Sequence, residues 1–199
     1  AATAIGAFIL EGSTKAATSA ATTPTANDIS VSEDATIAGS TVEATANESA
    51  FSFATKINAI SDTTNVYATA ETYAHLSTSQ TSTTSYTLSL NSVSTASFNM
   101  TSTDASGAVA AINSISSSTG VTATSTSNYQ VLLHDNTGAD ITIENASSST
   151  GLSVAAVLRD ASTESGSAVT LAASGSTDAT RVSGTIRLTS DATFSVVQA

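Results

Sequence analysis

The chain contains no cysteine and no tryptophan, and it has one proline and five basic residues among 199. The absence of cysteine excludes disulfide bonds, thiolate metal sites and cysteine nucleophiles. The basic residues are too scattered to form the cationic stripe that binds nucleic acid or an anionic membrane, so neither is expected as a partner. No run approaches the roughly 20 apolar residues of a membrane-spanning helix. The five basic residues are Lys15, Lys56, Arg159, Arg181 and Arg187.

The residues that are present favour a folded, strand-rich protein with a polar but weakly charged surface. Hydrophobic residues make up 40% of the chain, charged residues 11% and aromatic residues 5%. A disordered chain usually combines low hydrophobicity with high charge, which does not describe this sequence. Valine and the many threonines favour strands. The net charge of −11 comes from acids spread along the chain, and we interpret it as solubilising charge.

A duplicated segment is the most informative feature. Residues 57–69 read INAISDTTNVYAT, and residues 112–124, which lie 55 positions further on, read INSISSSTGVTAT. A repeat at a fixed spacing indicates that one supersecondary unit was copied and that the fold is modular. The matched positions hold no nucleophile, metal ligand or phosphate-binding loop. The repeat therefore predicts a copied structure rather than a copied chemistry.

Each copy is predicted to begin with a short helix. The apolar residues of each copy lie four and then three positions apart, which is one face of a helix, and we interpret this face as core rather than as a binding groove. These residues are Phe53, Ile57 and Ile60 in the first copy, and Ala108, Ile112 and Ile115 in the second.

The expected ends of these helices also match. The first helix is expected to begin at a capping box, Thr45 to Glu48, and the second at Thr103-Asp104. Asn65 and Gly120 occupy equivalent positions after the helices. Asparagine and glycine most readily accept the left-handed backbone that ends a helix, so we predict that conformation at both positions.

The remaining sequence is predicted to form short strands, giving an α+β fold that is mostly β, with short antiparallel strands and two short helices from the duplicated helix–strand unit. A loop is expected over 13–27, around Pro24, and a turn over 136–138. The expected strands are 4–10, 28–32, 35–38, 66–70, 86–90, 97–100, 121–125, 129–134, 140–144, 152–158, 168–172, 181–188 and 193–197.

Two regions are expected on this basis. Residues 1–46 and 151–199 are predicted to form a β-rich base subdomain from both chain ends. Residues 47–150 are predicted to form the duplicated region, with copies at 47–100 and 101–150.

The second copy and its surroundings, residues 105–145, resemble the "IN" motif of the surface-exposed region of bacterial flagellins, which also occurs in the filament-cap protein. The first copy keeps part of this motif, and the C-terminal strands resemble those that lead flagellin back to its helical core. The segments that carry the resemblance are 111–115 (AINSI), 119–123 (TGVTA), 129–133 (YQVLL), 138–143 (GADITI), 56–60 (KINAI), 65–68 (NVYA), 183–190 (SGTIRLTS) and 194–196 (FSV).

The resemblance implies a structural protein: the solvent-exposed outer domain of a flagellar filament subunit, extracellular and contributing to motility and surface properties. Its partners would be other copies of itself in a helical filament, with lateral contacts between outer domains. Flagellins polymerise through long terminal helices with heptads, which this sequence lacks, so the resemblance covers only the variable outer region. Its two ends are then expected to lie close together. Export of flagellins as unfolded chains through a narrow channel fits the absence of cysteine.

Two other classes remain as alternatives. A binding module, either a filament-cap fragment or a cell-surface adhesin domain, would need an aromatic or charged cluster, but the four tyrosines and five phenylalanines are spread along the chain. An enzyme would need a reactive constellation, and the sequence contains neither a Gly-x-Ser-x-Gly elbow nor an obvious acid/base pair. We therefore expect no enzymatic activity and no catalytic, cofactor-binding or metal-binding residues.

The residues that most resemble metal ligands have simpler interpretations. His75 and His134 are expected at the surface or at strand edges, because zinc sites need three or four convergent ligands. Residues 135–140 resemble a calcium loop but lack the distal glutamate, so a β-turn is the simpler prediction.

Modification sites are weakly indicated. N-glycosylation patterns are expected by chance in a chain rich in Ser, Thr and Asn. The resemblance to flagellin suggests O-glycosylation of exposed Ser/Thr runs, and plain solvated loops are the slightly preferred alternative. The patterns begin at Asn47, Asn99 and Asn145, and the runs cover 13–23, 77–85 and 146–150.

Overall fold

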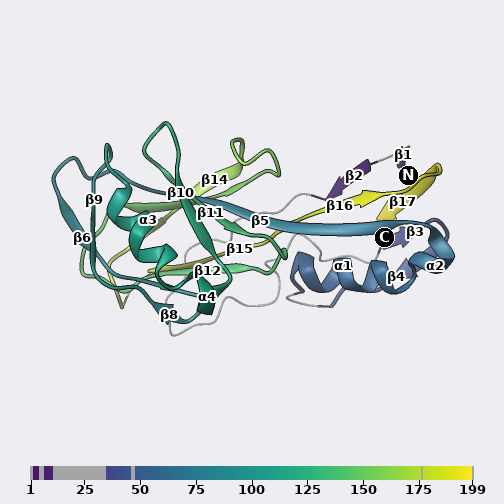
Figure 1. The fold of residues 1–199 in the computed structure, drawn as a ribbon, viewed down its shortest axis with the longest axis horizontal. Coiled ribbons are helices and arrows are strands. Elements are labelled where there is room, and N and C mark those ends of the chain that lie inside the picture. Colours follow the sequence, from purple (N-terminus) through teal and green to yellow (C-terminus); the bar gives the residue numbers. More distant parts are fainter. Residues whose placement is uncertain (1, 5–6, 11–34, 46–47, 176, 199) are drawn as a thin grey trace.

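The computed structural model describes residues 2–4, 7–10, 35–45, 48–175 and 177–198 (Figure 1). These residues form short antiparallel strands and four short helices, so the predicted α+β class, mostly β, is confirmed. Each predicted helix is followed by a further turn of helix that the sequence pattern did not separate. The helices are α1 (Ala50–Ala59), α2 (Ser61–Thr64), α3 (Ser106–Asn113) and α4 (Ser116–Thr119).

The described strands pair in one seven-stranded sheet and three smaller sheets. Within the described residues, the sheet orders are β1–β17–β3–β4, β10–β11–β5–β13–β14 and β15–β12–β7–β8, β6 pairs with β9, and β16 pairs with both β2 and β5. The strands are β1 (Ala2–Ala4), β2 (Ala7–Leu10), β3 (Ala35–Ile37), β4 (Ser40–Val42), β5 (Tyr67–Thr78), β6 (Thr84–Tyr86), β7 (Leu88–Leu90), β8 (Val93–Ser94), β9 (Phe98–Met100), β10 (Thr122–Ser125), β11 (Val131–Asp135), β12 (Ile141–Asn145), β13 (Leu152–Val157), β14 (Glu164–Leu171), β15 (Ala179–Val182), β16 (Thr185–Thr189) and β17 (Phe194–Gln198).

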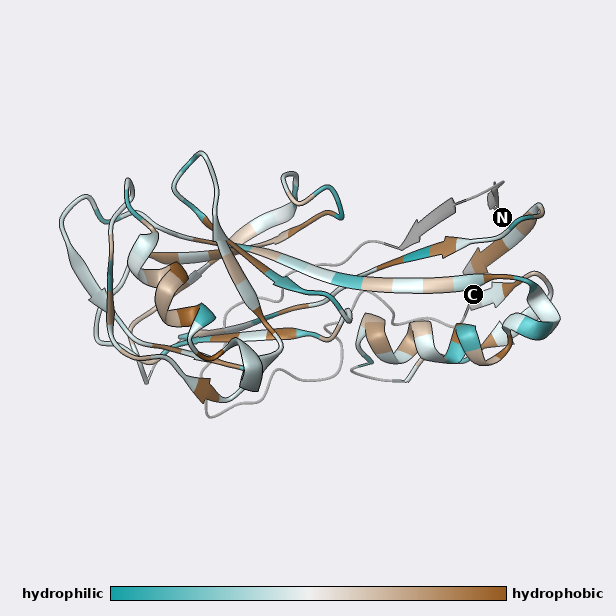
Figure 2. Cartoon of the chain, viewed as in Figure 1, coloured by the Kyte–Doolittle hydropathy of each residue, from teal (hydrophilic) through white to brown (hydrophobic). Residues whose placement is uncertain are grey.

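The buried side chains of the described residues form two separate hydrophobic clusters, and each contains the helix of one copy of the repeat. One cluster includes Phe53 and Ile57 of α1, and the other includes Ala108 and Ile112 of α3. We call the parts around them the base module (the described residues between 2 and 71, and 185–198) and the tip module (the described residues between 72 and 182). Figure 1 shows the two modules at opposite ends of an elongated molecule. In Figure 2, hydrophobic and hydrophilic residues are interleaved along α1, and the buried residues Ala50, Phe53, Ala54 and Ile57 have the spacing of one helix face.

Strand β5 runs through both modules. Its first part, up to Glu71, pairs with β16 in the base, and the part from Thr72 onward pairs with β11 and β13 in the tip. Because successive side chains of a strand point to opposite faces, alternate residues of β5 form one buried row. In this row Ala70 belongs to the base cluster and Ala74 to the tip cluster, with the fully buried Thr72 between them.

The clusters do not follow the predicted subdomain boundaries. Helix α1 and the first part of β5 lie in the predicted duplicated region, 47–150, yet they belong to the base cluster. Strands β13 and β14 lie in the predicted base segment, 151–199, yet Leu152 and Leu171 belong to the tip cluster. The reason is that the first copy's strand is long enough to reach from one cluster to the other, which the expected strand over 66–70 did not anticipate.

The two ends of the described chain lie together in the base. Strand β1 pairs antiparallel with β17, and both lie at the same end of the molecule in Figure 1. This arrangement agrees with the expectation that the ends are close in space.

Other predicted strands need correction. The strand expected over 181–188 is broken between β15 and β16, where a side chain on Gly184 would lie 2.5 Å from Thr72 Oγ1 and 3.0 Å from Ala50 Cβ. The chain therefore passes from tip to base at a point too crowded for a side chain. The predicted loop over 13–27 and strand over 28–32 lie outside the described residues.

Candidate functional site

One asparagine in each copy of the repeat binds the backbone of the strand that follows its helix. Asn58 Nδ2 donates to Ala68 O (2.9 Å), and Asn58 Oδ1 accepts from Ala68 N (2.7 Å). Asn113 makes the same pair of bonds with Ala123 O and Ala123 N, both at 2.8 Å. Since a side-chain amide carries the same donor and acceptor as a peptide group, each asparagine takes the place of a neighbouring strand. We call this pair of bonds the asparagine clamp.

The turn between helix and strand is also copied bond for bond. Thr64 Oγ1 donates to Ile60 O (3.0 Å), and its counterpart Thr119 Oγ1 donates to Ile115 O (3.2 Å). The next residues adopt the predicted left-handed backbone, with φ 53° at Asn65 and φ 76° at Gly120. The helix-end prediction is therefore confirmed in both copies, and the repeat preserves a complete hydrogen-bond network.

The predicted helix starts need correction in both copies. Helix α1 is capped by Ser49, whose Oγ accepts from Ser52 N at 3.2 Å. Asp104 occupies the equivalent position in the second copy, and its Oδ1 accepts from Ser106 N at 2.9 Å, but the residue that caps α3 is Ala105, which makes no side-chain cap hydrogen bond. The predicted capping box at Thr45 does not begin the helix, although Glu48 Oε2 does accept from Thr45 N at 2.9 Å.

The clamp gives a testable prediction. Replacing Asn113 with alanine should lower the free energy of unfolding by about 1–3 kcal/mol, because two backbone groups of Ala123 lose their partners. Urea unfolding followed by circular dichroism measures the change. Asn128 is the control, because it is exposed in the same part of the molecule and no side-chain hydrogen bond is seen for it within the described ranges. Equal effects of Asn113→Ala and Asn128→Ala would contradict the clamp.

The loop between β11 and β12 joins the two modules. Phe51 N of α1 donates to Gly138 O (2.9 Å), and Thr72 Oγ1 of β5 donates to Ala139 O (2.7 Å). The backbone of Gly138 packs so closely that an added Cβ would lie 2.3 Å from Ala70 Cβ. We call residues 136–140 the junction loop, because they bind both the helix and the long strand where the clusters meet.

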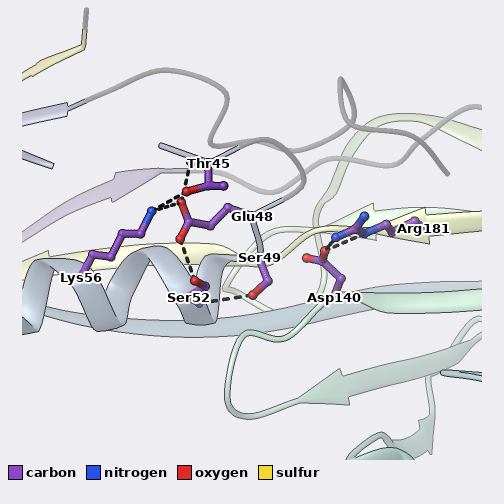
Figure 3. Close-up of a pocket in the computed structure, with 7 residues that line it drawn as sticks. All are labelled: Thr45, Glu48, Ser49, Ser52, Lys56, Asp140 and Arg181. Atoms are coloured by element: carbon purple, nitrogen blue, oxygen red, sulfur yellow. Dashed lines mark hydrogen bonds and ion pairs between the residues drawn. The ribbon is translucent and has the colours of Figure 1, made fainter. Parts of the chain in front are cut away.

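Beside the junction lies an open hollow of about 540 Å³ lined by two ion pairs (Figure 3). On one side, Glu48 has a side chain only 2% exposed and is 2.8 Å from Lys56 Nζ. Its other oxygen accepts from Ser52 Oγ at 2.6 Å. Lys56 also donates to Thr45 Oγ1 and to Glu43 O, each at 2.8 Å. This network fastens the first turns of α1 to the segment that precedes it.

On the other side of the hollow, Asp140 pairs with Arg181. Asp140 Oδ2 accepts from Arg181 Nε at 2.6 Å and also from Nη2. Burial raises the pKa of the Asp140 carboxyl, and Arg181 opposes that effect. The pair links the end of the junction loop to β15. No sequence pattern could have indicated it, because the two residues are 41 positions apart.

The Glu48 network predicts a pH effect of definite sign. Burial alone would raise the pKa of Glu48, but hydrogen bonds from Lys56, Ser52 and Thr45 outweigh it and lower the pKa below its usual value. The native state therefore binds the proton less tightly than the unfolded state. The stabilisation is complete above the unfolded value of about 4.3 and is lost as the pH falls through the lower folded value.

We expect Glu48→Gln to be less stable than the parent at pH 7, with the difference shrinking at the acidic end of a series of urea unfolding curves. Glu43→Gln serves as the control, because Glu43 is exposed on the neighbouring segment. A constant difference between Glu48→Gln and the parent at every pH would contradict the assignment.

The expectation that both histidines lie at the surface or at strand edges is wrong for His75, which is buried, whereas His134 is half-buried. His75 is 5% exposed in β5, and its Nδ1 is 3.0 Å from Glu164 Oε1. His134 lies in β11 and stacks on Tyr73, with ring centroids 4.2 Å apart. Both strands have neighbours on either side, so neither histidine is at a strand edge. Within the described ranges, no three His, Cys, Asp or Glu side chains form a group that could hold a metal ion.

The segment that resembles a calcium loop is a turn. Asp135 Oδ1 accepts from Thr137 N (2.8 Å) and Thr137 Oγ1 (2.5 Å), a local pattern typical of aspartate at turns. Gly138 follows with φ 82°. The second carboxylate, Asp140, binds Arg181, whereas Asp135 binds Thr137, so the two carboxylates do not share a partner.

The asparagines of the N-glycosylation patterns differ in how accessible they are in the structure. Asn145 is fully buried, and its Nδ2 donates to Ser149 O and Ala172 O, both at 2.7 Å, so this amide is occupied in the folded protein. Asn99 is exposed on β9. Asn47 and the run over 13–23 lie outside the described residues. The run over 77–85 begins within β5, where Thr78 is buried, and in the run over 146–150 Ser149 Oγ donates to Ser85 O at 2.8 Å.

None of the helices in the described part of the chain is long and apolar enough to cross a membrane. Comparison with known proteins found no protein-family model that matches the chain and no curated protein that matches it.

Proposed function

We propose that this chain is the solvent-facing outer region of a bacterial flagellin, carried on the outside of a helical filament as a structural, non-catalytic part. The observation that carries the proposal is the repeated unit. The two segments that resemble the flagellin motif share the asparagine clamp and the left-handed helix stop. A repeat whose equivalent hydrogen bonds all serve the backbone is typical of a scaffold rather than of a reactive site.

The arrangement of the ends supports the same role. An outer region must leave the filament core and return to it on the same side. Strands β1 and β17 pair in the base module, and the tip module lies at the other end of the molecule (Figure 1). The base would then face the filament, and the tip would face the medium. The partners would be other copies of the same subunit, with lateral contacts between neighbouring outer regions, and the location would be extracellular.

The junction supports a mechanical contribution to motility. An outer region on a rotating filament experiences drag, so the two modules should keep a fixed relative orientation. Strand β5 crosses between them without a break, and the junction loop binds both α1 and β5. These contacts brace the tip against bending relative to the base.

The intact mass of the native polypeptide, with peptide mapping beyond Ala1 and Ala199, tests this proposal. Long flanking segments with heptad repeats would support it, and filaments of that polypeptide should display the present chain on their outer surface. A native polypeptide without such helices would overturn it. The alternative of a filament-cap or adhesin binding module would then be favoured, and immobilised host-surface and filament components would be the ligands to screen.

A further inference from the structure

Asp140 lies where the segments that join the two modules meet. It directly follows Ala139, whose carbonyl accepts from Thr72 of β5. Its own carboxylate binds Arg181 of β15, the strand that leads into the base through the crowded passage at Gly184. Any change at this side chain therefore acts on the junction loop and on β15 together.

The Asp140 carboxylate is incompletely satisfied. Its side chain is 7% exposed, and only Oδ2 is held by Arg181. Oδ1 is buried and has no hydrogen-bond partner within the described ranges. In Figure 3, this oxygen points away from Arg181, toward the side of the hollow formed by Ser49 and Ser52. A buried carboxylate oxygen without a donor disfavours the ionised form, because it has lost its water without gaining a replacement.

The charged groups around Asp140 come from three elements. Arg181 on β15 favours the ionised carboxylate, whereas Asp135 at the end of β11 disfavours it. Across the hollow, Glu48 and Lys56 are bonded to each other. Burial is the largest of these influences, and together with Asp135 it raises the pKa of Asp140 despite Arg181.

We propose that Asp140 is a proton-operated latch: proton uptake tightens the junction between base and tip, and proton release loosens it. The sign follows from linkage. When the junction opens, Asp140 is solvated and its pKa returns toward the usual value of about 3.9. The closed junction thus binds the proton more tightly than the open one, so protonation shifts the equilibrium toward closure. This inference stands on the junction geometry and does not depend on the proposed function.

The amide of Phe51 reports closure directly, because its N–H donates to Gly138 O across the junction. Hydrogen exchange of this amide, measured by NMR on the full chain and corrected for intrinsic exchange, should become slower as the pH is lowered from 7.5 to 4, through the raised pKa of Asp140. The protection factor is expected to rise by up to about tenfold for each unit that separates the closed and open pKa values of Asp140. In Asp140→Asn, which stays neutral, protection should be high at both pH values.

Asp104→Asn is the control, because Asp104 is an exposed acid in the tip and an asparagine oxygen can accept the same hydrogen bond from Ser106 N. This variant should keep the parental pH dependence. The proposal is overturned if Phe51 protection is the same at both pH values, or if Asp140→Asn loses protection at pH 7.5, as loss of a simple stabilising ion pair would cause. If Asp140→Asn does not fold, carbon-13 titration of the parent decides: a pKa for Asp140 at or below about 3.9 rejects the latch, and a higher one supports it.

Discussion

Replacing Ile57 with alanine is expected to destabilise the base module, and replacing Ile112 the tip module, by about 2–5 kcal/mol in each case. The two isoleucines occupy equivalent positions in the repeat, and both are fully buried, one in each cluster. Each substitution removes the same atoms and leaves a cavity in a different core. The pair therefore tests whether the duplicated unit supports two distinct modules.

Urea unfolding gives the size of each effect, and hydrogen exchange gives its location. Ile57→Ala should reduce protection first in α1 and β16, and Ile112→Ala first in α3 and β10. Thr63→Ala and Ser118→Ala are the matched controls, since these residues are exposed and also equivalent in the repeat. Loss of protection spread evenly over both modules in each isoleucine variant would contradict the two-module description.

Replacing Gly138 with alanine is expected to lower the free energy of unfolding by about 2–5 kcal/mol and to uncouple the modules. Two effects combine here. The positive φ of 82° is unfavourable for alanine by about 1–2 kcal/mol, and the new methyl group would lie 2.3 Å from Ala70 Cβ. Such overpacking typically adds about 1–3 kcal/mol. Because Gly138 O also accepts from Phe51 N, the displaced loop should lose its bond to α1.

Gly39→Ala separates the two effects. Gly39 also has a positive φ, 86°, but an added Cβ would meet nothing within 4 Å. This variant should show the backbone effect alone. Thermal unfolding of Gly138→Ala should show two transitions or one broadened transition, whereas Gly39→Ala should keep the parental shape. If both variants lose the same free energy of unfolding and unfold with the same cooperativity, the close packing around Gly138 does not contribute to stability or to the coupling of the modules.

The repeated unit could be predicted from sequence because its signals are local. The spacing of Phe53 and Ile57 predicts one face of a helix, and the asparagine at 65 and the glycine at 120 predict the left-handed backbone that ends a helix. The structure has both features. The matched asparagines at 58 and 113 were also visible as part of the repeat. Their role as clamps was missed because an exposed asparagine in a helix does not indicate which backbone it binds.

The features of the fold that depend on contacts between residues far apart in the sequence could not be predicted. An alternating pattern shows that residues near 66–70 form a strand, but the length of β5 is set by three partners, β16, β11 and β13. The junction combines Phe51, Thr72 and Gly138, and no periodicity relates these positions. For the same reason His75 and His134 were placed at edges: neither residue's own neighbourhood indicates the strands that flank it.

The arrangement of the modules along the chain has a consequence for the order of folding. The described tip residues lie within one continuous stretch, 72–182, whereas the base needs α1 from the first half together with Ile186 and Leu188 near the C-terminus. A chain that emerges from its N-terminus thus completes every strand of the tip before β16 and β17 exist. Helix α1, although earlier in sequence, must wait for these late strands. We expect the tip to fold first and residues 185–198 to complete the base afterwards.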